Sequence, residues 1–193
     1  MIAENLKILN ERIKAKCDEL NRNPEEIKLI AVSKTYGVDA ISSANDLGLK
    51  DFGENKAQEL RDKYNVLGDK VAWHFIGNLQ RNKVKYVIKA AALIHSVDSI
   101  ILADEINKQA SKLCKVQKIL LEVKTSFEES KSGAEGEESL KELTGHCESL
   151  ENIDLIGLMT MAPYTNDEKI IRQSFSELRK LKDKLNEIGR AHV

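Results

Sequence analysis

The sequence predicts an α/β fold of the (β/α)8 TIM-barrel type, with about six of the eight strands present in its 193 residues. Short apolar runs alternate with amphipathic stretches, which is the order of βα units joined by right-handed crossovers into a parallel sheet. Polar residues follow most of these runs directly, as a barrel site built from strand ends requires. The first run is not followed by a glycine-rich phosphate loop, which disfavours a doubly wound nucleotide-binding sheet.

Each expected strand is a short apolar run bounded by polar or turn residues. The run KLIAVS at residues 28–33 is almost continuously apolar, which is typical of a strand buried on both faces of a parallel sheet. Further strands are expected at residues 51–54, 71–77, 92–97, 118–124 and 154–161. These six runs fall short of the eight strands that close a barrel of this type.

Amphipathic helical stretches separate the expected strands. The first helix is predicted at residues 2–20, where Ile2, Leu6, Leu9, Ile13 and Cys17 recur at helical intervals. The other helices are expected at residues 38–47, 56–67, 78–90, 100–113, 137–150 and 167–188. The chain contains two prolines and no Gly/Ser-rich linker, so residues 1–193 are expected to form a single domain.

Composition and charge narrow the class of protein. The 31 acidic and 30 basic residues leave a formal net charge of −1, so there is no electrostatic footprint for nucleic acid or for an anionic membrane. The N-terminal segment lacks the apolar core of a signal peptide, and no run reaches membrane-spanning length. Cys17, Cys114 and Cys147 form neither a C-x-x-C pair nor a metal-ligand cluster. We expect a cytoplasmic protein without a metal site.

Lys34 is the sharpest candidate functional residue. It follows the apolar run IAVS directly, so its amine is expected to enter the barrel mouth between apolar walls. Removal of water favours the neutral, nucleophilic form of a lysine amine, which is the form that adds to an aldehyde to make a Schiff base. Position alone leaves a second interpretation equally open, in which Lys34 ends the strand and extends into water.

The next two strand ends carry an amide and an imidazole. In FGENKAQEL, Asn55 is expected to cap the following helix in a capping-box arrangement with Gln58, and it also borders the barrel mouth. In WHFIGNLQRNK, Trp73 and Phe75 alternate with His74, so His74 faces the opposite side of the strand. A lone histidine in a strand is more often a hydrogen-bonded core residue than a catalyst.

The turn after this strand and a later loop add weaker candidates. Gly77 permits close backbone approach, and Asn78 is expected to cap the next helix. The polar segment 122–133 is long enough to act as a lid, from which Lys131 could reach a bound anion. A solvated, charged loop is the simpler interpretation of that segment.

The remaining strand ends are polar or methionine-rich. In GLMTMAP, Met159 and Met161 alternate with Thr160, a pattern that is more typical of core packing than of a cofactor wall. The other polar residues at strand ends are Glu54, Asp98 and Glu122. No nucleophile elbow of the form G-x-S-x-G is present, and no catalytic residue is assigned.

The order of these motifs is more specific than any of them alone. IAVSKT, FGENKAQE, WHFIGNLQRNK, HSVDS, KSG and GLMTMAP together resemble the pyridoxal-phosphate homeostasis proteins, over nearly all of residues 1–188. The resemblance implies a single barrel domain similar to the N-terminal domain of alanine racemase, with pyridoxal 5′-phosphate (PLP) as cofactor. It also implies that Lys34 is the Schiff-base lysine, that Asn55, His74 and Met159 help to line the pocket, and that Lys131 lies nearby.

The resemblance implies a carrier rather than a turnover enzyme. Members of the family are thought to hold PLP and to hand it to PLP-dependent enzymes, which would be the partners of this protein, and they are monomers. A racemase relies on a second domain and a second acid/base group, neither of which is predicted here. The alternatives are a PLP-dependent racemase or decarboxylase-like enzyme, or a Schiff-base aldolase, on the same barrel.

The chain departs from the family pattern at its C-terminus. Family members continue through two further strands, whose loops hold the phosphate, whereas this sequence ends in GRAHV where the seventh strand is expected. Three explanations are open: a truncated product, a missing portion on a separate chain, or another molecule that covers the gap. A truncated form is expected to hold PLP weakly or not at all, and its open sheet edges would favour a swapped or other oligomer.

Overall fold

The computed structural model describes residues 1–125 and 133–187. Its centre is a six-stranded sheet in the order β1-β2-β3-β4-β5-β6, and every neighbouring pair is parallel. A doubly wound sheet reverses its strand order at a switch point, whereas this order follows the chain without reversal. The sheet is therefore the wall of a (β/α)-barrel-type fold, as predicted. The strands are β1 (Ala31–Val32), β2 (Asp51–Glu54), β3 (Ala72–Phe75), β4 (Ala91–Val97), β5 (Gln117–Glu122) and β6 (Ile153–Met159).

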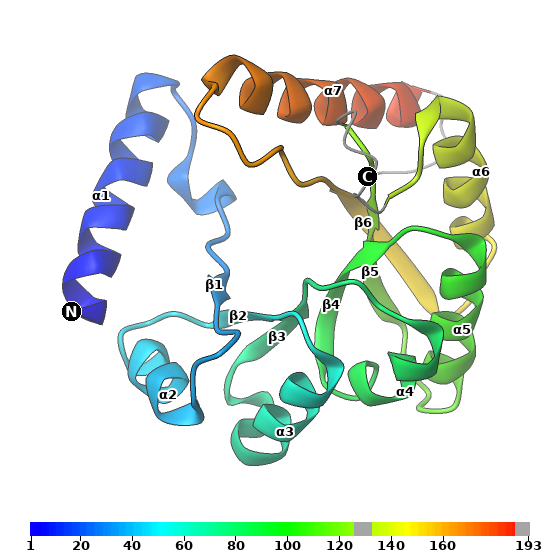
Figure 1. Ribbon diagram of the computed structural model, residues 1–193, viewed down its shortest axis with the longest axis horizontal. Coiled ribbons are helices and arrows are strands. Elements are labelled where there is room, and N and C mark those ends of the chain that lie inside the picture. Colours follow the sequence, from blue (N-terminus) through cyan, green and yellow to red (C-terminus); the bar gives the residue numbers. More distant parts are fainter. Residues whose placement is uncertain (126–132, 188–193) are drawn as a thin grey trace.

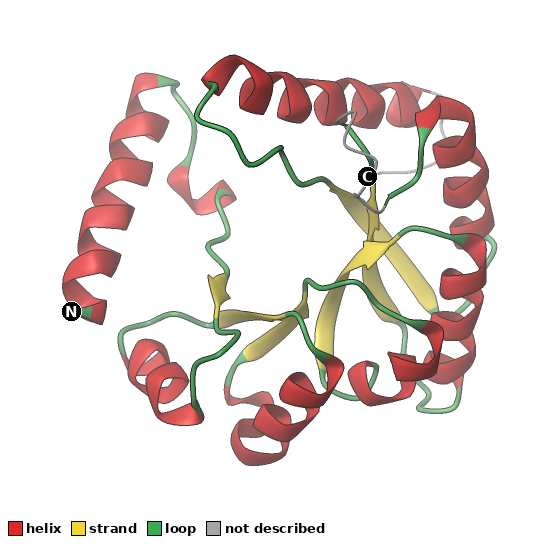
Figure 2. Ribbon diagram, viewed as in Figure 1, coloured by secondary structure: helices red, strands yellow, loops and turns green. Residues whose placement is uncertain are grey.

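Helices α2 to α7 lie around the outside of the curved sheet, and α1 stands to one side, next to the segment that leads into β1 (Figures 1 and 2). None of the helices within the described ranges is long and apolar enough to cross a membrane. The helices are α1 (Ile2–Glu19), α2 (Val38–Asp46), α3 (Ala57–Leu67), α4 (Val84–Val87), α5 (Ile100–Ser111), α6 (Gly136–Glu148) and α7 (Glu168–Glu187), with 3-10 turns η1 (Pro24–Glu26), η2 (Gly68–Lys70) and η3 (Arg81–Lys83).

The helix-facing side of the sheet carries the large apolar side chains. Phe52, Trp73 and Phe75 are fully buried, and the Trp73 indole donates a hydrogen bond of 3.0 Å to the Gly68 carbonyl beyond α3. His74 lies on the opposite side, where it contacts side chains of neighbouring strands. The alternation predicted along β3 is therefore confirmed, and it separates an apolar outer layer from a polar inner face.

The prediction of one helix over residues 78–90 is wrong. The chain remains irregular to Gln80, makes the 3-10 turn η3 and then forms α4, a helix of four residues. Gln80, not Asn78, occupies the N-cap position of that turn. Leu79 and Ile88, on either side of the short helix, are both buried in the core. Tertiary packing of these apolar residues therefore overrides the local helical pattern.

The first strand is also shorter and more open than predicted. β1 consists of two residues and pairs only with β2, and the side chain of Val32 is 46% exposed. A strand is buried on both faces only when other elements cover each of them. β1 is instead an edge strand of the described sheet, so the prediction of a strand buried on both faces is wrong.

Candidate functional site

A cavity of about 400 Å³ lies at the carboxyl ends of the strands. Its volume falls within the range of small-molecule pockets. Because parallel strands end at the same rim of a barrel, residues far apart in sequence meet there. The residues that line it are Lys34, Asn55, Ile76, Gly77, Asn78, Glu122, Val123, Lys124, Thr125, Thr160 and Met161.

Lys34 reaches this cavity from the end of β1. The Ser33 backbone N–H donates to the Gly53 carbonyl at 2.9 Å, which extends the β1–β2 ladder to the residue before Lys34. Lys34 is nevertheless exposed to solvent. The predicted position at the mouth is therefore confirmed, whereas the predicted enclosure of Lys34 is wrong, because Lys34 is exposed at the end of β1, which has a neighbouring strand on one side only in the described sheet.

Asn55 lines the same cavity from the end of β2. Lys56, not Asn55, is the N-cap residue of α3, and α3 has no side-chain cap, so the predicted capping role is wrong. The Asn55 Oδ1 atom is instead buried without a hydrogen-bond partner in the described parts of the chain. A buried acceptor left without a donor costs free energy unless a ligand or water supplies one. Asn55 Oδ1 therefore has the capacity to accept a further hydrogen bond beside the cavity.

Gly77 brings the end of β3 against the end of β2. A Cβ atom at Gly77 would overlap the Asn55 carbonyl oxygen and would lie 2.8 Å from the Asn55 Cα. The Ile76 N–H donates to the Glu54 carbonyl at 2.9 Å one residue earlier. The predicted close backbone approach at Gly77 is confirmed, and it determines where Asn55 lies at the cavity.

His74 is buried on the inner face of the sheet and is not among the residues that line the cavity. Its Nδ1 lies 2.8 Å from Nε2 of His95, and its Nε2 lies 2.9 Å from Oδ1 of Asp51. Burial lowers the pKa of His74, although Asp51 opposes this effect. Burial, followed by the neighbouring His74, lowers the pKa of His95 to about 4. Both rings are therefore neutral near pH 7, and Asp51 favours the His74 tautomer protonated at Nε2.

The remaining predicted site residues lie near or beyond the described wall. Met159 ends β6 half-buried, and its carbonyl accepts a hydrogen bond of 2.8 Å from the Val123 N–H; the next two residues, Thr160 and Met161, line the cavity. Lys131 lies outside the described residues. The chain leaves the described part at Thr125, on the cavity wall, and the Lys124 N–H donates to the Ala134 carbonyl at 3.1 Å where it returns. A role for Met159, His74 or Lys131 in cofactor binding stays a prediction.

Glu122 also lines the cavity, and its chemical role is not evident from the sequence. It ends β5, and burial, followed by the nearby Asp98 carboxylate, raises the pKa of Glu122 to about 7. A carboxyl group with such a pKa can hold or release a proton at neutral pH. Its place at a strand end was visible in the sequence, but desolvation depends on neighbours from other strands.

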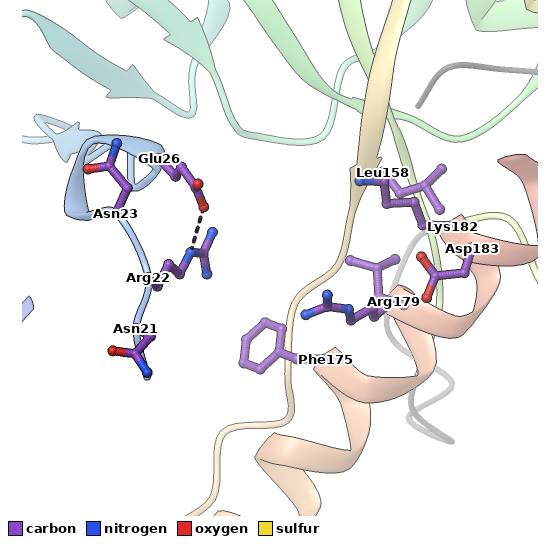
Figure 3. Close-up of a pocket in the computed structure, with 10 residues that line it drawn as sticks. Asn21, Arg22, Asn23, Glu26, Leu158, Phe175, Arg179, Lys182 and Asp183 are labelled. Carbon is purple, nitrogen blue, oxygen red and sulfur yellow. Dashed lines mark hydrogen bonds and ion pairs between the residues drawn. The ribbon is translucent and has the colours of Figure 1, made fainter. Parts of the chain in front are cut away.

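A second cavity, of about 590 Å³, lies between α7 and the segment that follows α1 (Figure 3). Arg22 and Glu26 form an ion pair of 3.2 Å on one side of it, and Phe175 and Arg179 extend from α7 on the other. It is the larger of the two cavities. It lacks the convergence of several strand ends that brings Lys34, Asn55 and Glu122 together, so we assign the functional site to the smaller cavity.

Comparisons with known proteins agree with this architecture. The family model described as "Alanine racemase, N-terminal domain" matches residues 8–193. A pyridoxal phosphate homeostasis protein of Aquifex aeolicus is 44% identical over 183 residues, which cover 94% of this chain and 80% of the relative. A protein of the same name from Haemophilus influenzae is 35% identical, and the match covers 97% of this chain and 80% of the relative.

Solved structures show the same fold. An unknown protein from Bifidobacterium adolescentis superposes with a TM-score of 0.90 at 33% identity, over 97% of this chain and 80% of that one. PipY of Synechococcus elongatus, solved with PLP bound, has a TM-score of 0.84 at 28% identity, over 100% of this chain and 86% of that one. An alanine racemase of Clostridium difficile, at 19% identity and a TM-score of 0.73, shares the fold alone. The chain belongs to the pyridoxal phosphate homeostasis protein family, whose barrel is that of the alanine racemase N-terminal domain.

Proposed function

We propose that this protein binds PLP through a Schiff base on Lys34 and takes part in intracellular PLP homeostasis as a carrier. Three observations support the proposal. The relatives are named for PLP homeostasis, and a relative of the same fold has been solved with PLP bound. In this chain, Lys34 and Asn55, whose buried Oδ1 lacks a hydrogen-bond partner among the described residues, line the same cavity, and this shared position is the observation that carries the proposal.

The residues of the cavity fit an aromatic aldehyde that carries polar substituents. The Lys34 amine would add to the aldehyde carbon, and loss of one water would leave a carbon–nitrogen double bond. Asn55 Oδ1 would accept a hydrogen bond from a donor on the bound molecule, which would supply the partner that it lacks. Glu122 would hold a proton near this bond at neutral pH. We keep His74, Met159 and Lys131 as proposed neighbours of the cofactor, and PLP-dependent enzymes as proposed recipients.

We expect the purified protein to gain a visible absorption band with PLP, and borohydride reduction to fix the label on Lys34. Lys34→Ala should abolish the fixed label, because no other amine of the described chain lines the cavity except Lys124, which lies 3.5 Å from Glu135. Mass spectrometry of the reduced protein would identify the labelled lysine. Lys50→Ala, at the opposite end of β2, is the matched control and should label normally. Label on another residue, or no label at all, would contradict the proposal.

One observation favours a second candidate function, an enzyme that moves a proton on a PLP-bound amino acid. Glu122, with its pKa raised to about 7, is a group of the kind that general acid–base catalysis requires. Exchange of the α-hydrogen of amino acids in heavy water separates the two candidates. A carrier should exchange it no faster than free PLP does. If the protein exchanges the α-hydrogen faster than free PLP does, and Glu122→Gln loses this exchange, the result would support the enzyme and contradict the carrier.

A further inference from the structure

Lys34 lies in a tight turn that closes the end of β1. The Tyr36 N–H donates a hydrogen bond of 3.0 Å to the Ser33 carbonyl, so residues 33–36 form a β-turn with Lys34 and Thr35 at its centre. Thr35 has a φ of +70°. A positive φ at this third position is the pattern of a type II turn, where glycine or asparagine is usual. A β-branched residue is strained there, and such strain persists only where the surroundings hold it.

Side chains from β2 and helix α3 contact two residues of this turn, Ser33 and Thr35. Lys63 Nζ donates to the Ser33 carbonyl at 2.9 Å and lies 2.6 Å from Glu54 Oε1, and the Ser33 hydroxyl donates to the same Glu54 oxygen at 2.6 Å. On the other side, Glu59 Oε2 accepts from the Thr35 N–H at 3.5 Å and lies 3.7 Å from Lys63 Nζ. The carbonyl that Lys63 holds belongs to the planar peptide group that joins Ser33 to Lys34.

The ion pair between Lys63 and Glu54 is buried, and a contribution to stability alone does not explain its presence. The Glu54 side chain is 0% exposed and that of Lys63 is 11% exposed. Glu54 Oε2 is also buried without a hydrogen-bond partner in the described part of the chain. Replacing a buried ion pair by uncharged groups of similar volume is often neutral or stabilising, because the charges lose their hydration. A buried pair directly beside the Lys34 turn therefore points to a positional role.

We propose that Lys63 is a positioning residue of this site: with Glu54 as its buried counter-ion, it holds the strained turn 33–36 in the form that directs Lys34 into the cavity. The inference rests on the proposed function of Lys34. It assigns to Lys63 no contact with the cofactor. Its consequence is that loss of the Lys63 contact relaxes the turn and lowers the fraction of molecules in which Lys34 is correctly placed.

The test uses Lys63→Met combined with Glu54→Gln, so that no buried charge is left unpaired. The equilibrium label of Lys34 by PLP, fixed with borohydride, should fall about tenfold if relaxation of the turn releases strain of the usual size. Adding Thr35→Gly, which accepts a positive φ without strain, should restore most of the label. The matched control is Lys180→Met, which removes an exposed ion pair of α7 with Glu177 at 2.8 Å and should label normally.

Exchange of the Tyr36 amide proton provides a readout that needs no cofactor. Its protection should fall in the double variant and return with Thr35→Gly, while protection of the core strands stays unchanged. Wild-type labelling by the double variant, or a loss of label and amide protection that Thr35→Gly does not reverse, would overturn the inference. If the double variant does not fold, the triple variant decides: a folded protein labelled at Lys34 supports the inference, and an unlabelled one overturns it. Failure of the wild type itself to label Lys34 would refute the proposed function, and the amide readout would still test the turn.

Discussion

Gly77→Ala is expected to destabilise the protein by about 3 kcal/mol or more and to abolish labelling of Lys34 by PLP. The added Cβ would overlap the Asn55 backbone carbonyl, and a backbone atom cannot move away by changing a rotamer. The ends of β2 and β3 would have to separate, which displaces Asn55 from the cavity. Urea denaturation would measure the loss in the free energy of unfolding, and borohydride trapping would measure the label.

Gly145→Ala is the matched control for this substitution. Gly145 lies within α6, and a Cβ there would meet no atom within 4 Å. Alanine is favoured over glycine in a helix interior, so this variant should be more stable by about 0.5–1 kcal/mol. If Gly77→Ala were as stable as the control and still labelled, the close approach of β2 and β3 would not be what determines the position of Asn55.

The buried histidine pair is expected to make the protein less stable in acid. The pKa of His95 is about 4 in the folded protein, against 6.5 for the model side chain. Between these values the unfolded chain takes up a proton that the folded protein does not, so the free energy of unfolding falls as the pH is lowered. The full shift corresponds to about 3 kcal/mol lost between pH 6.5 and pH 4. Urea denaturation at a series of pH values measures this loss.

The titration of Glu122 opposes the loss of stability in acid that His95 causes, so the effect of His95 is clearest in a variant without the Glu122 carboxyl group. Its pKa is raised to about 7 in the folded protein, so between about pH 7 and 4.5 the folded state binds more protons than the unfolded chain, and acidification stabilises it. Glu122→Gln should therefore show a steeper loss of stability in acid than the wild type. Adding His95→Gln, which keeps a donor for His74 Nδ1, should flatten the profile. An unchanged slope in that double variant would show that His95 does not control the acid response. His146→Gln, which replaces a partly exposed histidine, is the matched control substitution.

Most strands and helices could be predicted from local sequence patterns, and the predictions that failed did so for a common reason. Five of the six strands are observed within two residues of the predicted positions, because the contrast between apolar and polar runs is a local property. The helix expected from residue 78 fails because Leu79 is drawn into the core. β1 is shorter and more exposed than expected because exposure of a strand depends on its neighbours in the sheet, and β1 has one.

The site follows the same division. The position of Lys34 after the first strand, the polar character of the strand ends and the alternation of His74 with Trp73 and Phe75 were readable from the sequence. Only the tertiary structure shows that Asn55 lines the cavity and does not cap the helix. It also shows that His74 contacts Asp51 and His95, and that Lys63 donates a hydrogen bond to the Ser33 carbonyl in the turn next to Lys34. Sequence spacing specifies which residues each strand end presents. Burial and hydrogen bonding across strands, which determine whether those groups are charged, paired or open to a ligand, arise only when distant segments pack together.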